Sequence, residues 1–157
     1  MLSKVLNYMV DVTVDNGMVR VFEHPHTPQI ASLESACCVS STAMYYFICK
    51  YYDISINGEK VVSEILKLQD KDQKSPTYGN LKWYREQDGV IDTNAAFFGL
   101  LPIALVYLKY PEKLTDNEKL IVEEMLERGA HWFVKECMSG GYAYTNKEAS
   151  SGAALLL

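Results

Sequence analysis

The sequence lacks the features that mark a membrane protein or a nucleic-acid-binding protein. Its formal net charge is −5 and its lysines and arginines are scattered, so no basic field would attract phosphate backbones or anionic lipid. The longest apolar run, residues 95–108, is shorter than the roughly 20 residues that span a bilayer. The apolar stretch at residues 2–10 meets Asp11 too early to form a signal-peptide core. We therefore expect no nucleic-acid partner, no membrane partner and a cytoplasmic location.

The chain also lacks the cysteine and histidine spacing of disulfide-rich or zinc proteins. It contains 4 cysteines and no CxxC pair. Cys38 and Cys49 would lie about 16 Å apart along one helix, which is too far for a disulfide. We interpret all the cysteines as small buried hydrophobic residues. His24 and His26 would need third and fourth metal ligands that the sequence does not offer. We predict neither a metal nor a cofactor.

What the sequence does have is the composition of one folded domain. With 157 residues, 48% hydrophobic and 22% charged, the chain can bury roughly two thirds of the surface of its unfolded state. This balance excludes a disordered chain. We therefore treat residues 1–157 as a single domain.

Hydrophobic periodicity predicts a mainly helical fold with two kinds of helix. Residues 58–69 and 116–137 each have one apolar and one charged side, as outer helices that cover a core do. Inner helices, by contrast, are apolar or small on nearly every side and need protein contacts all round. This second pattern occurs in residues 31–49, within a longer helix over residues 29–52, and in residues 95–108 and 149–157. We expect the helices at 31–49 and 95–108 to be adjacent and more buried than the outer ones.

Local signals mark several element boundaries. Asn16 and Gly17, flanked by valines, are typical of a two-residue turn, so a small β-hairpin is predicted near residues 12–21. A short amphipathic helix over residues 2–10 precedes it. Thr115 and Glu118 have the spacing of a capping box at the start of the 116–137 helix. The same spacing recurs between Thr145 and Glu148, which predicts a last helix from Asn146.

A weak internal repeat links the predicted inner helices, because each follows a glycine turn and starts with a polar residue and small residues. With "YGNLKWY" at residues 78–84 and "DTNAAFF" at residues 92–98, this organisation resembles the α/α toroids of six-hairpin glycoside hydrolases and polysaccharide lyases. The resemblance implies an all-α array of helical hairpins, about half a ring, from a larger toroid. The apolar edge of an incomplete ring would favour self-association.

The resemblance also implies a carbohydrate-active protein whose site lies at a mouth formed by the loops before the inner helices. Its ligand would be an oligosaccharide or polysaccharide. The candidate catalytic residues are Asp92, Glu34, Glu148 and Tyr84. The candidate substrate-binding residues are Tyr78, Asn80, Trp83, Arg85 and Asn94, whose aromatic faces suit sugar rings and whose polar groups suit hydroxyls or a carboxylate.

Two reactions are compatible with these residues. In a glycoside hydrolase, Asp92 would act with Glu34 or Glu148, one as the acid and the other as the base or nucleophile. In a polysaccharide lyase, Tyr84, His24 or His26 would abstract the proton beside a uronate carboxylate that is held by Asn94 or Arg85. The overall acidity of the chain counts against a polyanionic substrate.

The same residues also have structural interpretations. Trp83 and Tyr84 would equally pack a long loop against helices, and Asp92 lies where a helix N-cap is expected. The other candidate carboxylates would simply lie in first helical turns. A non-catalytic helical-repeat scaffold that binds a protein or peptide at its helix ends is therefore the alternative function. The sequence leaves open whether the protein is an enzyme.

Overall fold

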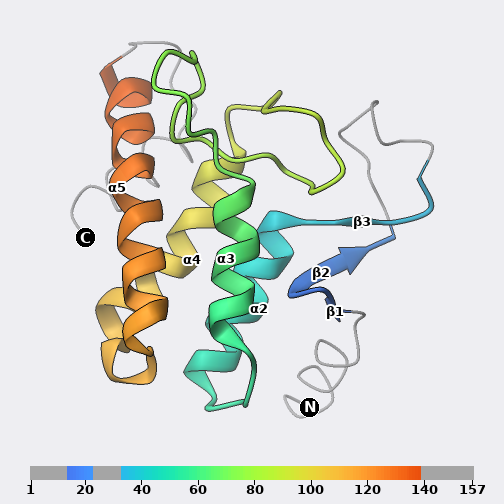
Figure 1. Cartoon of the computed structure of the whole chain (residues 1–157), viewed down its shortest axis with the longest axis vertical. Coiled ribbons are helices and arrows are strands. Elements are labelled where there is room, and N and C mark those ends of the chain that lie inside the picture. The colour runs from blue at the N-terminus through green and yellow to red at the C-terminus, as the bar shows by residue number, and fades with distance from the viewer. Residues whose placement is uncertain (1–13, 23–32, 139–157) are drawn as a thin grey trace.

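The computed structural model describes residues 14–22 and 33–138 (Figure 1). In these ranges the chain forms strands β1 (Val14–Asp15), β2 (Met18–Val21) and β3 (Ala36–Cys37), helices α2 (Val39–Tyr51), α3 (Gly58–Lys67), α4 (Ala95–Lys109) and α5 (Asp116–Met138), and the 3-10 helix η2 (Pro111–Lys113). The helices predicted at residues 2–10 and from Asn146 lie outside the described residues, as do His24, His26 and Glu148.

The three strands form one antiparallel sheet in the order β1-β2-β3. Asn16 and Gly17 connect β1 to β2 with φ angles of 52° and 89°, the left-handed conformation that a tight hairpin turn requires. This turn places Val14 opposite Val19. The predicted hairpin is therefore confirmed, and β3 adds a strand that the sequence did not predict.

Helices α2 to α5 form two pairs that run in opposite directions. Gly99 in α4 lies against Val39 at the amino end of α2, and the rings of Tyr51 and Tyr110, at the opposite ends of these helices, have centroids 5.7 Å apart. Helices α2 and α4 are therefore adjacent and parallel. Helices α3 and α5 lie in front of them in Figure 1 and run the other way. The expected adjacency of the two apolar helices is confirmed.

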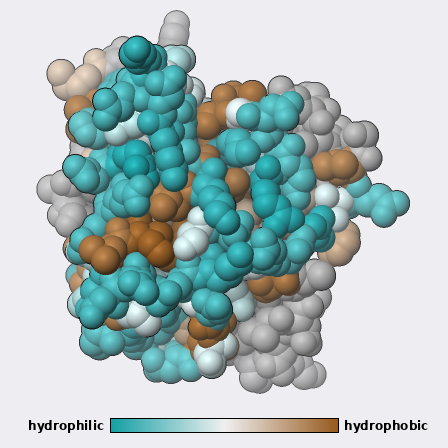
Figure 2. All heavy atoms as spheres, viewed as in Figure 1, coloured by the Kyte–Doolittle hydropathy of each residue, from teal (hydrophilic) through white to brown (hydrophobic). Residues whose placement is uncertain are grey.

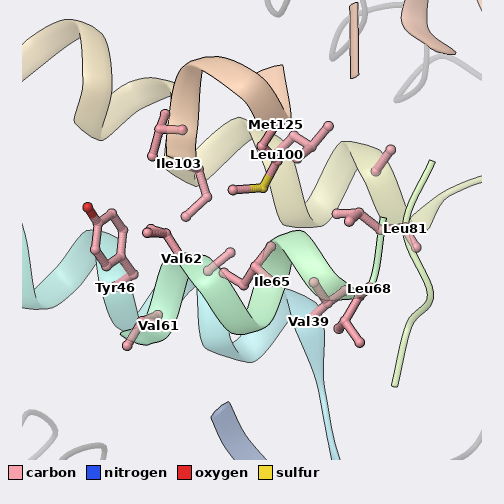
Figure 3. Close-up of a cluster of buried hydrophobic side chains, with 14 of the residues drawn as sticks. Val39, Tyr46, Val61, Val62, Ile65, Leu68, Leu81, Leu100, Ile103 and Met125 are labelled. Atoms are coloured by element: carbon pink, nitrogen blue, oxygen red, sulfur yellow. The ribbon is translucent and has the colours of Figure 1, made fainter. Parts of the chain in front are cut away.

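The hydrophobic core fills the space among these helices (Figure 3). Leu100 and Ile103 from α4 face Val62 and Ile65 from α3, and Met125 from α5 lies between them. All five side chains have 0% exposure. Because burial of one such side chain contributes about 1.5–3 kcal/mol, this layer is the main force holding the helices together.

The predicted difference in burial holds for α4, whereas α2 is more buried than α5 but not more buried than α3. Helix α4 is buried along most of its length, whereas α2 buries six of its 13 residues and α3 five of its 10. Helices α3 and α5 form a face covered mainly by hydrophilic residues (Figure 2), as expected of outer helices. Of the helices in the described ranges, none combines the length and the hydrophobicity that crossing a bilayer would require.

The predicted fold class is wrong. Within residues 14–22 and 33–138 the protein has four helices and a three-stranded antiparallel sheet, and not an all-α, toroid-like array of hairpins. The predicted helix over residues 29–52 begins only at Val39. Ala36 and Cys37 instead form β3, because their backbone groups pair with β2 and Arg85 N donates to Cys37 O at 3.0 Å.

The buried carboxylate of Glu118 lies where the carboxyl end of α2 meets the amino ends of α3 and α5. The predicted capping box is confirmed, since Glu118 N donates to Thr115 Oγ1 at 3.1 Å and Thr115 N donates to Glu118 Oε2 at 2.8 Å. Glu118 is only 1% exposed, and it also accepts hydrogen bonds from Tyr46 Oη at 3.0 Å and Lys50 Nζ at 2.9 Å. Burial and the nearby carboxylate raise the pKa of Tyr46, which therefore remains a donor.

Lys113 completes this end of the molecule by capping α2. Its Nζ donates to the carbonyl oxygens of Lys50 at 2.9 Å and Tyr51 at 3.1 Å, and it lies 2.9 Å from the Asp53 carboxylate. Lys50 Nζ donates in return to Lys113 O at 2.9 Å. The last carbonyls of α2, which have no partner within the helix, are thus satisfied from η2.

Replacing Glu118 by Ala should destabilise the fold by about 3–5 kcal/mol, because it leaves Lys50 partly buried without its counter-charge and removes the helix cap. Urea unfolding followed by circular dichroism measures the loss. Glu127→Ala, at an exposed position of the same helix, should change stability by less than about 0.5 kcal/mol. Equal effects of the two substitutions would contradict the structural role of Glu118.

Candidate functional site

The amino ends of α2 and α4 lie at the same end of the molecule, where the loop of residues 68–94 covers them (Figure 1). The loop contacts both helices. Val39 N, at the start of α2, donates to Trp83 O at 2.8 Å, and Ala96 N, at the start of α4, donates to Asn80 Oδ1 at 3.0 Å. Because most of the candidate residues belong to this loop, this end of the molecule is the candidate functional site.

Asn80 holds the loop to α4. It is 0% exposed, and its Oδ1 also accepts a hydrogen bond from Leu81 N at 2.7 Å. Its Nδ2 donates to Asp92 O at 3.0 Å. Asn80 was predicted to bind substrate, but both polar atoms of its side chain are hydrogen-bonded within the protein. It caps α4 and does not face a ligand.

Asp92 and Asn94 lie where α4 begins. Asp92 Oδ1 accepts a hydrogen bond from Asn94 N at 2.7 Å, which fixes the turn before the helix. Asp92 is therefore structural, but it is not the N-cap residue that its structural interpretation had made it. Asn94 is the N-cap residue, but its side chain makes no capping hydrogen bond and its buried Oδ1 has no partner in the described part of the chain. Asp92 is half-buried, and in the same part of the chain no hydrogen bond is made to its Oδ2.

Trp83 and Phe98 form an aromatic pair near the amino end of α4. Their ring centroids are 5.5 Å apart with an angle of 35° between the planes. Trp83 is half-buried, whereas Phe98, in the first turn of α4, is 51% exposed. Ile91, just before Asp92, is 50% exposed. An aromatic surface is thus partly exposed at the first turn of α4.

Two further candidate residues, Tyr84 and Arg85, contact residues in or next to the β-sheet. Tyr84 is 7% exposed and packs against Cys38 in a small separate cluster. Arg85 donates to Asp15 Oδ2 at 2.7 Å. Hydrogen bonds from Arg85 and then Arg20 hold the pKa of Asp15 below its usual value, which shows that the Arg85 charge is balanced within the protein.

The remaining candidates lie elsewhere. Tyr78 packs against His131 of α5, with ring centroids 5.7 Å apart. Glu34 is exposed and precedes β3 rather than starting a helix, because the predicted helix does not extend there. The structure therefore brings Asn80, Asp92 and Asn94 together at the start of α4, pairs Trp83 with Phe98, and places Tyr78 against α5.

The cysteines are buried, as predicted, at the three described positions, which are Cys37, Cys38 and Cys49. Burial raises the pKa of Cys37 to about 11, so it remains a neutral thiol at physiological pH. Cys38 is the N-cap residue of α2, with its Sγ 3.2 Å from Ser40 Oγ. No group of three or more histidine, cysteine, aspartate or glutamate side chains in residues 14–22 and 33–138 could hold a metal ion.

Comparisons with protein-family models, with curated proteins and with solved structures found no match to this chain. The resemblance to α/α toroids therefore receives no support from a relative. Function is inferred below from the geometry of the loop and of the two helix ends.

The loop itself is fixed to α5. Gln69, which is 4% exposed, donates from Nε2 to Gly79 O and to Met125 O, both at 2.9 Å. Its Oε1 accepts a hydrogen bond from Arg128 Nε at 3.1 Å. Gly79 has a φ of +86°, and a Cβ atom there would lie 2.1 Å from Arg128 O. Only glycine allows this close contact between the loop and the helix backbone.

Substituting Gly79 by Ala should therefore lower the free energy of unfolding. The loss should exceed about 1–3 kcal/mol, which is the usual cost of forcing an extra methyl group into a packed site. A thermal unfolding series provides the measurement. Gly89→Ala is the matched control, because a Cβ atom on Gly89 would have no heavy atom within 4 Å. If both variants unfold at the parent temperature, the loop is not anchored as described.

A comparison of two asparagines tests whether Asn80 is structural. Asn80→Ala should cost about 1–3 kcal/mol for each buried group that it leaves unpaired, which includes Ala96 N and Asp92 O. Asn94→Ala should cost far less, because its side chain makes no capping hydrogen bond. The readout is the urea midpoint of each variant. A stable Asn80→Ala protein would show that this amide is free for another role.

Proposed function

We propose that this protein binds an oligosaccharide or polysaccharide at the common amino end of α2 and α4. The observation that carries the proposal is the half-exposed ring of Phe98, which lies against the ring of Trp83. Flat aromatic faces suit the apolar faces of sugar rings.

The proposal concerns binding and not catalysis. Glycoside hydrolysis needs two carboxyl groups on either side of one bond, about 5–5.5 Å or about 6.5–9.5 Å apart. Of the predicted carboxylates, Asp92 accepts a hydrogen bond from Asn94 N before α4, Glu34 precedes β3, and Glu148 lies outside the described residues. Tyr84, the predicted lyase base, is buried against the sheet. Saccharide binding is thus the part of the prediction that these contacts favour.

A non-catalytic scaffold that binds a protein or peptide at its helix ends is the second candidate. Its support is the apolar surface on α2, where Met44 is 44% exposed and Tyr51 is 45% exposed. A partner that covered these side chains would gain hydrophobic free energy. Self-association and a cytoplasmic location also stay predictions from the sequence.

Calorimetric titration of the parent and of Phe98→Ala, with a broad panel of oligosaccharides, tests the proposed function. Removing this ring should weaken binding by on the order of 1–3 kcal/mol, the range for burial of a large apolar side chain. Stability should change little, because the ring is half exposed. Trp83→Ala should weaken binding by a similar amount.

Leu120→Ala is the matched control, because Leu120 is a 64% exposed apolar residue on α5. It should bind saccharide as the parent does. If no saccharide in the panel binds the parent, or if Phe98→Ala binds with unchanged affinity, the proposed function is wrong and the scaffold remains.

A further inference from the structure

Apolar side chains outside the core form one row on α2 and a second row on α4. The rows are Met44, Ile48 and Tyr51 in α2 and Leu101, Leu105 and Leu108 in α4. Met44 and Tyr51 are exposed, and the other four residues are half-buried. Within the described part of the chain, none of the six belongs to the core clusters. Because helices that are apolar on nearly every side need protein contacts all round, we expect a partner at these rows.

Both rows lie on the side of the molecule that faces away from α3 and α5. Leu100 and Ile103 of α4 and Tyr46 of α2 point into the core (Figure 3). Residues three or four positions apart share a helix face, so the rows, which follow a different register, lie on the faces that the core leaves uncovered. The rings of Tyr51 and Tyr110, the residue after α4, meet edge to face. Since α2 and α4 are adjacent and parallel, the two rows form one surface, the α2–α4 face.

The spacing of both rows is that of a surface which packs against other helices. In each row the residues are separated by four and then three positions, the spacing of the a and d residues that meet in paired helices. Residues 39–49 and 95–108 contain no charged side chain, and Lys50 and Lys109 come only in the last turns of their helices. The α2–α4 face therefore suits apolar helices without charges.

This absence of charge restricts what covers the α2–α4 face. A charged partner surface would lose its hydration there, and no side chain in the two rows would compensate for that loss. The face of α3 and α5 in a second copy is excluded for this reason, because it carries exposed carboxylates such as Glu123 and Glu127. The α2–α4 face of a second copy has the same spacing and no charge, and a two-fold axis brings identical surfaces together.

We propose that two copies of this chain associate through their α2–α4 faces around a two-fold axis. The inference goes beyond the proposed function and does not depend on it. Helices of 13 and 15 residues are about 20 Å long, so a face two helices wide measures about 20 Å by 20 Å. This is less than the ~800 Å² per partner of a standard interface, so the dimer is weak, with a dissociation constant above about 1 μM.

Sedimentation velocity of the full chain, from about 1 μM to about 500 μM, tests the proposal across the range expected of a weak interface. The parent should pass from monomer to dimer and no further, because a two-fold contact closes. High salt should not weaken the dimer, since no ion pair holds it. A monomer at every concentration, growth beyond the dimer, or dissociation by salt would each overturn the proposal.

A pair of matched variants locates the contact. Met44→Glu should raise the dissociation constant at least about tenfold, because like charges brought together in an interface cost several kcal/mol. Leu120→Glu places the same charge at an exposed apolar position on α5 and should leave the dimer unchanged. Circular dichroism checks that both variants fold, as their exposed positions predict. Equal dimerisation of Met44→Glu and the parent would overturn the proposal. Neither variant changes Trp83 or Phe98, so saccharide binding is tested separately.

Discussion

The arrangement of the helices depends on one buried carboxylate. Glu118 begins α5, binds Tyr46 and Lys50 of α2, and lies so close to the start of α3 that a Cβ on Gly58 would be 1.8 Å from its Oε1. Removing such a charge from water costs several kcal/mol, and that cost is offset only when donors surround it. The donors come from the capping box and from α2, so the network forms only when these elements meet in one arrangement. Because the Glu118 network fixes the helices at this end, it also determines where the amino ends of α2 and α4 lie at the opposite end.

At the other end of the molecule, buried side-chain amides hold the loop of residues 68–94 in one position. Asn80 joins the loop to α4, and Gln69 joins it to α5. Buried polar groups of this kind are costly unless all their hydrogen bonds are made, and for that reason they specify one conformation. A loop held in this way loses little conformational entropy when a ligand binds to it. The surface at Trp83 and Phe98 is thus preorganised, although it lies at the edge of an irregular segment.

Much of this fold could be predicted from local sequence, and the rest could not for identifiable reasons. Periodicity and capping located α3, α4 and α5, and an Asn-Gly pair located the hairpin. Strand β3 escaped prediction because Ala36 and Cys37 are small residues whose pairing with β2 is not local in sequence. At the candidate site, polar loop residues were expected to face a ligand, yet Asn80 and Arg85 proved to be structural once their partners were known. Phe98 was missed because an apolar helix offers no pattern that separates its exposed residues from its buried ones.

The position of a polar loop directly before the most apolar helix now has a physical explanation. Helix α4 has an N-cap residue that forms no side-chain capping bond and no acidic residue in its first turn, so its first N–H groups need acceptors from elsewhere. The preceding loop supplies one through Asn80 Oδ1, which accepts from Ala96 N, while Asp92 fixes the turn before the helix through Asn94 N. Since these polar side chains bond to the backbone at the start of the helix, the feature left for a ligand is the aromatic pair of Trp83 and Phe98. An aromatic surface suits the apolar face of a sugar ring, whereas glycoside hydrolysis would require two carboxyl groups facing the same bond.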